Sequence, residues 1–243
     1  MILQAAEDRM VVVSDLHLGS PASTAGQRLP SFFDHIEATG AALCINGDGF
    51  ELLQGNFKRW VTSALPVVRR LRRLRDSGCR IYYTIGNHDI AFEHVLHDLP
   101  IAVTPFLNVT SGDRRIHIEH GHLQEPFYAR YPRLYQYGAV MARPLLVARA
   151  DTYELWSRMQ RAVDERRHHR RHGADGEAEV DYTYYRSASM FFDRGFDAVI
   201  FGHTHRPEIT ELSDGLFVNC GDWMSGGTYA EIQHGKVTLE RWG

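Results

Sequence analysis

Short apolar runs alternate with helical patterns and polar clusters along most of the chain. Runs rich in β-branched and aromatic residues predict buried strands at residues 10–13, 41–45, 81–85, 114–119 and 198–201. Further strands are predicted at 105–110, which pairs with 114–119 around a Gly-containing turn, and at 216–219, 228–232 and 237–242. Strands interspersed with helices indicate an α/β fold.

Apolar residues recur at helical spacing in five segments. These predict helices at residues 31–39, 57–76, 89–97, 145–167 and 177–194. Pro66 lies inside the second segment and is expected to kink that helix or to start a new one. We expect one domain over residues 1–243, with a helical cap inserted at about 123–195, because polar motifs of one kind flank that stretch on both sides.

Five of the predicted strands end in a glycine-bearing polar cluster. Ligand sites of layered α/β proteins lie beyond the carboxyl ends of strands, so these clusters are expected at one edge. Their candidate metal ligands are Asp15, His17, Asp48, Asn87, His120 or His122, His203 and His205. Carboxylates, imidazoles and an amide without thiolates suit Mn²⁺, Fe or Zn²⁺. Seven ligands suit two ions about 3.5–4 Å apart, bridged by a carboxylate.

Composition narrows the function classes. The chain has 243 residues, 44% hydrophobic and 23% charged, which allows a sizeable core. Its formal net charge of -3 gives no indication of nucleic-acid binding. Three cysteines without a CxxC pair favour a reducing compartment, and so a cytoplasmic protein. No signal peptide is visible, and no apolar run approaches the ~18 residues of a membrane span.

The polar clusters, taken in order, resemble the motifs of the calcineurin-like metallophosphoesterase superfamily. They are Asp15-x-His17, Gly47-Asp48-x-x-Glu51, Gly86-Asn87-His88-Asp89, His120-Gly121-His122 and Gly202-His203-x-His205. The resemblance implies an αββα sandwich of two facing mixed sheets flanked by helices. It implies that one metal is held by Asp15, His17, Asp48 and His205, and the other by Asp48, Asn87, His120 and His203. In the fourth motif it favours His120 over His122.

The implied reaction is hydrolysis of a phosphoester or diphosphate by a hydroxide that bridges two divalent ions, with manganese the expected metal. Asn87, His88 and His203 are expected to contact the substrate phosphate. His88 would stabilise the charge that develops at phosphorus or protonate the leaving oxygen. Glu51 is expected to orient His88. Asp89 has no predicted role.

Finer features resemble the bacterial UDP-2,3-diacylglucosamine pyrophosphatases of lipid A synthesis, in the segments 15–18, 47–51 and 202–207. That likeness implies cleavage to lipid X and UMP, acyl chains bound by the cap, and peripheral contact of the cap with the inner membrane. Five cap residues would line an acyl groove or else pack the cap on the core: Trp156, Met159, Tyr184, Phe191 and Phe192.

One residue departs from that subfamily. At position 88 this chain carries histidine, as the wider superfamily does, whereas those pyrophosphatases usually carry arginine there. The alternative is therefore a soluble phosphodiesterase or phosphatase that acts on a small nucleotide or a phosphoprotein. A non-catalytic scaffold is the third interpretation, although a scaffold would be expected to lose ligands that this chain keeps. No nucleic-acid partner is expected, and the sequence does not indicate an oligomeric state.

Overall fold

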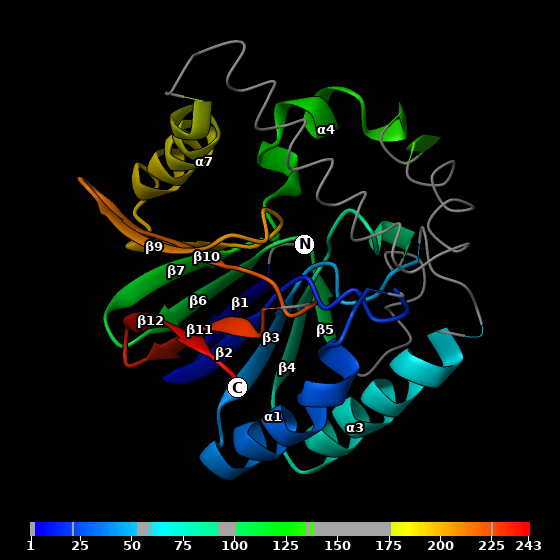
Figure 1. Ribbon diagram of the computed structural model, residues 1–243. Helices are drawn as coiled ribbons and strands as arrows, with labels where there is room; N and C mark the ends of the chain where they lie inside the picture. The colour runs from blue at the N-terminus through cyan, green and yellow to red at the C-terminus, as the bar shows by residue number, and fades with distance from the viewer. Residues whose placement is uncertain are drawn as a thin grey trace.

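Two six-stranded sheets pack face to face in a computed structural model that describes residues 3–20, 22–52, 58, 60–91, 101–134, 137–138, 176–224 and 226–243. The first sheet has the order β1-β6-β7-β8-β10-β9 and the second β12-β11-β2-β3-β4-β5. Helices cover both outer faces, with α1 and α3 under the second sheet and α7 over the first (Figure 1). The predicted α/β fold with two facing mixed sheets is confirmed.

The second sheet combines four parallel strands from the N-terminal half of the chain with a C-terminal hairpin. Strands β2 (Arg9–Val13), β3 (Ala42–Asn46), β4 (Ile81–Thr84) and β5 (Ala102–Thr104) run parallel. The hairpin of β11 (Thr228–Gln233) and β12 (Lys236–Arg241) joins antiparallel beside β2. Helix α1 (Ala25–Thr39) follows β2, and a π-helical turn (Trp60–Ala64) leads into α3 (Leu65–Asp76).

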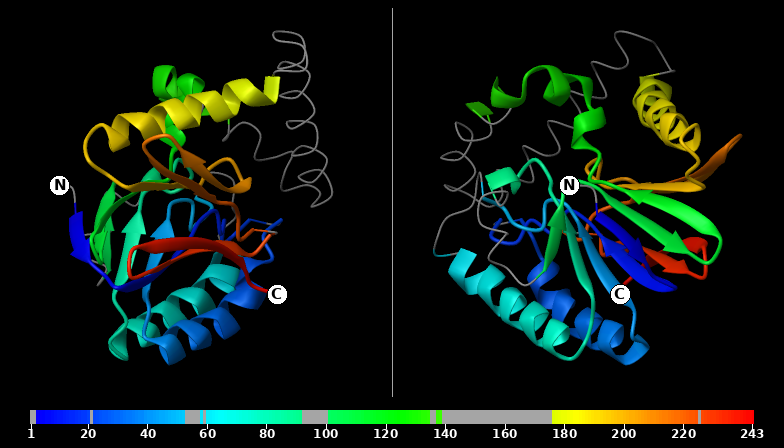
Figure 2. Two further views of the ribbon diagram at one scale, coloured as in Figure 1. Left: turned by 90° about the vertical axis from the view of Figure 1, so that its left-hand side faces the viewer. Right: turned by 180° about the vertical axis from the view of Figure 1, so that it is seen from behind.

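The first sheet combines strands from both halves of the chain. It contains β1 (Leu3–Ala6), β6 (Leu107–Ser111), β7 (Arg114–Ile118), β8 (Ala198–Phe201), β9 (Pro207–Leu212) and β10 (Gly215–Cys220). Strands β7, β8 and β10 are parallel neighbours. After β7 come a 3₁₀ turn (His122–Gln124) and α4 (Pro126–Arg130), and α7 (Gly176–Phe192) precedes β8. Figure 2 shows α7 lying across this sheet, on the side away from α1 and α3.

Alternate residues of a strand face opposite layers, and the core follows this rule. On β2, Met10 and Val12 lie in the cluster between the two sheets, whereas Val11 and Val13 pack in the cluster with α1 and α3. A third cluster joins α7 to the outer face of the first sheet. Every residue of β3 is buried, as expected for a strand covered on both faces.

Several boundaries differ from the sequence-based prediction. Helix α1 starts at Ala25, six residues before the predicted start at residue 31, because Ala25 and Leu29 extend its buried face and Pro30 is accommodated within the helix. Strands β1, β5 and β9 were not predicted. They are short or lie at sheet edges, and β9 alternates exposed and half-buried residues instead of forming an apolar run.

The cap prediction is only partly covered by the described residues. The helix predicted at 177–194 corresponds to α7, whereas the helices predicted at 145–167 and, beyond residue 91, at 89–97 lie outside the described residues. Tyr184, Phe191 and Phe192 are buried against Val199, Phe201 and Phe217, so these three pack the helix on the sheet. Trp156 and Met159 lie outside the described residues. None of the described helices is both long and apolar enough to cross a bilayer.

Phe32 offers a test of the helix-to-sheet core. Its side chain is fully buried, and its ring centroid lies 4.5 Å from that of Trp223 and 5.0 Å from that of Tyr229. Phe32→Ala should lower the free energy of unfolding by ~3–5 kcal/mol, because it leaves a cavity among rings that cannot close over it. The measurement is the urea unfolding midpoint. Ile209→Ala, at a side chain 44% exposed, is the control and should shift it little.

Candidate metal centre

The candidate site lies where five strands of both sheets end. Asp15 follows β2, Asp48 follows β3 and Asn87 follows β4 in the second sheet, while His120 follows β7 and His203 follows β8 in the first. Within each sheet these strands run parallel to one another, so their carboxyl ends lie at the same edge of that sheet. The shared edge predicted from the sequence is therefore the end of a sandwich, to which both sheets contribute.

Asn46 joins the two sheets directly beneath this edge. Its fully buried side chain donates a hydrogen bond from Nδ2 to the Glu119 carbonyl, at 2.9 Å, and accepts one from Thr84 Oγ1, at 2.6 Å. Its own carbonyl oxygen accepts from His120 Nδ1 at 2.9 Å and from Ser14 Oγ at 2.7 Å. One residue thus contacts three of the ligand-bearing strand ends, two in its own sheet and one in the other.

The first ligand group contains Asp15, His17 and His205. Each offers one ligand atom, and these atoms lie within 4.8 Å of one another. Asp15 Oδ1 lies 3.1 Å from His205 Nε2 and 3.7 Å from His17 Nε2. The same oxygen is buried and accepts no hydrogen bond from any described residue, as expected of an atom that faces a cation.

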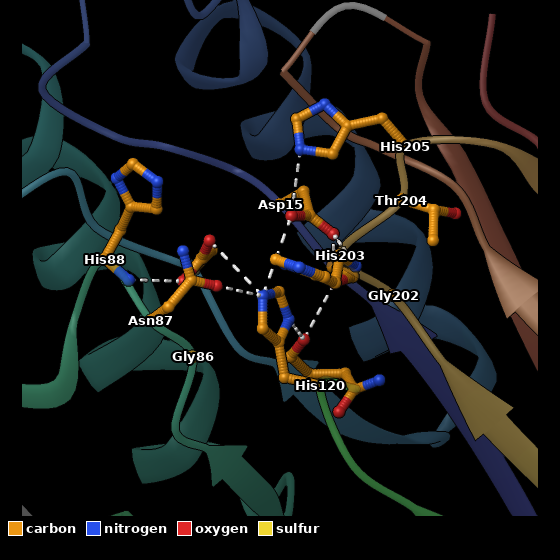
Figure 3. Close-up of polar contacts among 12 residues, drawn as sticks. Asp15, Gly86, Asn87, His88, His120, Gly202, His203, Thr204 and His205 are labelled. Atoms are coloured by element: carbon orange, nitrogen blue, oxygen red, sulfur yellow. Dashed lines mark hydrogen bonds and ion pairs between the residues drawn. The ribbon is translucent and has the colours of Figure 1, made fainter. Parts of the chain in front are cut away.

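The second group contains Asp48, His120 and His203, with Asn87 beside it. Asp48 Oδ2 lies 3.3 Å from His120 Nε2, and Asn87 Oδ1 lies 3.2 Å from the same nitrogen. Asp48 Oδ2 is also 3.8 Å from His17 Nε2 of the first group. Asp48 therefore belongs to the second group and also lies near the first. Figure 3 shows Asp15, Asn87, His120 and His203 directed toward a common centre.

The structure separates the two histidines of the fourth motif. His120 belongs to the second ligand group, and its Nδ1 is used by the Asn46 carbonyl, which leaves Nε2 for the centre. His122 lies behind it, with its ring 5.5 Å from that of His120 and 4.8 Å from that of Tyr128, and belongs to none of the ligand groups of the described residues. Burial lowers the pKa of His122 to about 3, so it is uncharged.

His88 and Glu51 form the third side of the centre. Glu51 Oε1 lies 3.0 Å from His88 Nδ1, and its Oε2 lies 3.2 Å from His17 Nδ1. The buried carboxylate thus contacts a predicted metal ligand as well as the predicted catalytic histidine. His88 is also grouped with His17 and Asp48, its backbone N–H donating to Asp48 Oδ1 at 2.8 Å.

The carboxylates of the site are held ionised. Burial alone would raise the pKa of Asp48, but the neighbouring His120, His88 and His17 lower it well below its usual range. Asp15 follows the same pattern, with His205 and His120 outweighing its burial. Burial likewise opposes the low pKa of Glu51, which His88 and His17 produce. Three buried anions among imidazoles form an environment that suits divalent cations.

The backbone at the ligands is strained. Six non-glycine residues of the described chain have a positive φ between 42° and 68°, and five of them are predicted ligands: Asp15, His17, Asp48, His203 and His205. Side chains in this left-handed region are disfavoured, and such conformations cluster at functional sites. Together with the donor set and the Asp15 oxygen, the backbone fits a site built to hold metal ions.

Asp89, which had no predicted role, connects two ligand loops. Its Oδ1 accepts from the Gly86 N–H at 2.7 Å, and its Oδ2 accepts from the Gly49 N–H at 2.9 Å and from the Tyr83 hydroxyl. The loop that carries Asp48 is thereby fixed against the loop that carries Asn87. The sequence gives no signal for this function beyond the position of Asp89 in the third motif.

Gly86 provides a test of how closely these loops must approach. A Cβ on Gly86 would lie less than 3.0 Å from both Oδ1 and N of Asp48. Gly86→Ala should therefore displace Asp48 and weaken Mn²⁺ binding by roughly 10–100-fold, the usual effect of disturbing a ligand's support. Calorimetric titration with Mn²⁺ measures it. Gly138→Ala, where no atom lies within 4 Å of the added Cβ, is the control; equal affinity in both variants would contradict the expected crowding.

Comparison with known proteins agrees with this geometry. The calcineurin-like phosphoesterase family model matches residues 9–207. Proteins named UDP-2,3-diacylglucosamine hydrolase from Stenotrophomonas maltophilia (strain K279a) and Xanthomonas axonopodis pv. citri (strain 306) are 27% and 28% identical to this chain. Each alignment covers 94% of this chain, with 96% of the first protein and 97% of the second.

Two solved structures share the fold. A novel archaeal phosphodiesterase aligns with a TM-score of 0.50 and 15% identity over 96% of this chain and 98% of its own. YfcE, a phosphoesterase from E. coli, aligns with a TM-score of 0.50 and 17% identity over 96% and 92%. The motifs, their arrangement at the end of the sandwich and the family match over most of the length lead to one conclusion: the chain belongs to the calcineurin-like phosphoesterase family.

Proposed function

We propose that this metal-dependent phosphoester hydrolase cleaves the diphosphate of UDP-2,3-diacylglucosamine, to give UMP and lipid X. The observation that carries the proposal is the paired ligand groups around Asp48, in a chain that aligns over 94% of its length with hydrolases of that substrate. The proposed metals are two Mn²⁺ ions, with Fe or Zn²⁺ as alternatives that the same donors suit.

The metal assignment follows the two groups. Asp15, His17 and His205 would hold one ion, and Asn87, His120 and His203 the other, with Asp48 shared between them. Two divalent ions held there would activate a water molecule near neutral pH and neutralise phosphate oxygens. Glu51 contacts Nδ1 of His17, and the Asn46 carbonyl contacts Nδ1 of His120. In both rings this contact leaves Nε2 to face the centre.

His88 is proposed as the catalytic residue, with Asn87 and His203 also near the substrate phosphate. Burial would lower the pKa of His88, but the neighbouring Glu51 and Asp48 carboxylates raise it in the metal-free protein. A proton held on this ring can stabilise charge that develops at phosphorus or pass to the leaving oxygen. Glu51 would orient the ring through its hydrogen bond.

The surface beside the centre suits a substrate with an apolar part. A cavity of about 100 Å³ borders His120 and His122 and is otherwise lined mostly by apolar residues: Ile85, Ile90, Pro105, Phe106 and Leu123. The segment after His122 exposes Leu123, Tyr131, Leu134 and Tyr137. Tyrosines, leucines and the neighbouring Arg130 are a combination found at bilayer interfaces, so we propose that the enzyme acts in the cytoplasm at the inner membrane.

A substrate panel tests the proposal. Purified protein loaded with Mn²⁺ is given UDP-2,3-diacylglucosamine in detergent micelles and, separately, a chromogenic phosphodiester, and UMP and chromophore are quantified. We expect UMP from the lipid. Chromophore release without UMP would contradict the lipid substrate and support the alternative of a soluble phosphodiesterase, for which His88 in place of the subfamily's usual arginine is the argument.

His88→Ala tests the catalytic assignment. Because His88 is proposed to act on the reacting phosphate and not to hold a metal, its loss should lower kcat by roughly 10²–10⁴-fold while two Mn²⁺ ions stay bound. Turnover and metal content are measured on the same preparation. His234→Asn, an exposed histidine in the β11–β12 turn whose φ of 47° asparagine tolerates, is the matched control. Unchanged turnover, or loss of metal, would sink the assignment.

Glu51→Ala should behave differently from His88→Ala. Since the Glu51 carboxylate contacts both His17 and His88, its removal should reduce turnover and also weaken Mn²⁺ binding at the first ligand group, by roughly 10–100-fold. Parallel calorimetric titrations of the two variants make the comparison. A Glu51→Ala protein with normal metal affinity would restrict Glu51 to the orientation of His88.

A further inference from the structure

Glu125, a residue outside all of the sequence motifs, contacts the second ligand group. Its Oε2 lies 3.0 Å from Nε2 of His203. The two side chains are 38% and 12% exposed, so the contact is partly shielded from water. Glu125 is itself held by its backbone, which donates to the His122 carbonyl and accepts from the Ala129 N–H at 2.9 Å. The carboxylate is thus presented to His203 from a fixed position between the 3₁₀ turn and α4.

This contact determines which nitrogen of His203 is free. A carboxylate only accepts hydrogen bonds, so Nε2 of His203 carries a proton and donates it to Glu125. In the uncharged ring the lone pair is then on Nδ1, the nitrogen that remains for a metal. The backbone N–H of His203 donates to Asp15 Oδ2 at 3.0 Å. His203 is therefore fixed at the main chain by a residue of one ligand group and at the ring by Glu125.

We infer that Glu125 is a positioning residue of the metal centre, which fixes the tautomer and orientation of His203 and so sets the affinity for the second ion. Carboxylates that accept from a metal-bound histidine commonly act in this way. The contact also connects the segment His122–Arg130 to the centre. The inference rests on the proposed role of His203 as a ligand, but it does not depend on the identity of the substrate.

Three substitutions separate contact from charge. Glu125→Ala removes the acceptor, Glu125→Asp keeps the charge but shortens the side chain by one methylene, and Glu125→Gln keeps an oxygen at the same reach. We expect alanine and aspartate to weaken one of the two Mn²⁺ sites by roughly 10–100-fold and leave the other within about 2-fold, whereas glutamine should stay within about 3-fold of the unsubstituted protein. Glu211→Ala, at an exposed acid of the edge strand β9, is the control and should change neither site.

Two measurements that do not depend on turnover provide the readout. Calorimetric titration gives both affinities, and electron paramagnetic resonance distinguishes an exchange-coupled pair of Mn²⁺ ions from a single ion. Nitrogen-15 spectra of the histidine rings in the metal-free protein should show His203 protonated at Nε2, with that preference lost in Glu125→Ala but kept in Glu125→Gln. Its resonance is identified by its absence in His203→Gln.

The outcomes discriminate between the proposals. Two unchanged Mn²⁺ affinities in Glu125→Ala, or equal weakening of both sites with a lowered unfolding temperature of the metal-free protein, would overturn the positioning role. If Glu125→Ala does not fold, the aspartate variant and the ring spectra of the unsubstituted protein decide the question in the same way. An unsubstituted protein that binds fewer than two ions would overturn the metal assignment and this inference with it. Two bound ions without release of UMP would refute only the substrate.

Discussion

A single centre assembled from two sheets requires those sheets to be fixed relative to each other at the end where the ligands emerge. Asn46 meets this constraint with two hydrogen bonds. Its side-chain amide donates to the Glu119 carbonyl, and its own carbonyl accepts from the ring nitrogen Nδ1 of His120. The Gly202 N–H extends the connection by donating to the His120 carbonyl, and Asn219 Nδ2 donates to the Gly202 carbonyl. These bonds, together with the apolar cluster between the sheets, fix the strand end that precedes Asp48 relative to the strand end that carries His120.

The centre also requires the loops that carry Asp48 and Asn87 to approach closely. Gly47 lies against the His120 ring and Gly86 against Asp48, each so near that a Cβ would be less than 3.0 Å from the neighbouring atoms. Asp89 then joins the loops through their backbone N–H groups. The glycines allow the carboxylate to sit between the two ligand groups, and the Asp89 bonds keep it there.

The sequence predicted much of this because the fold concentrates its chemistry at strand ends. Each buried run is followed directly by candidate ligands, so Asp15, Asp48, Asn87 and His203 could be proposed from the pattern alone, whereas the resemblance to the family was needed to favour His120 over His122 and to predict the sandwich. What pattern cannot give is contact between distant segments. In the sequence, Asn46 is one polar residue in the cluster after a predicted strand, and Glu125 is one acid among many; only the structure shows that they contact Glu119 and His203.

The sequence-based prediction missed the edge strands and the start of one helix for a related reason. The residues of β9 alternate between exposed and half-buried, and β5 has only three residues, so neither produces the apolar run that marks a central strand. The start of α1 was missed because the residues before position 29 are mostly small and polar, although buried Ala25 and Leu29 continue the apolar face of the helix there.

The left-handed backbone at five of the predicted ligands lowers the stability of the folded protein. If each such residue costs about 1 kcal/mol, the low end for strained backbone, the five together oppose folding by roughly 5 kcal/mol. That is comparable to the entire stability of many domains. Ions that bind only the folded protein would offset part of this cost, so the metal-free protein is expected to be the less stable of the two forms.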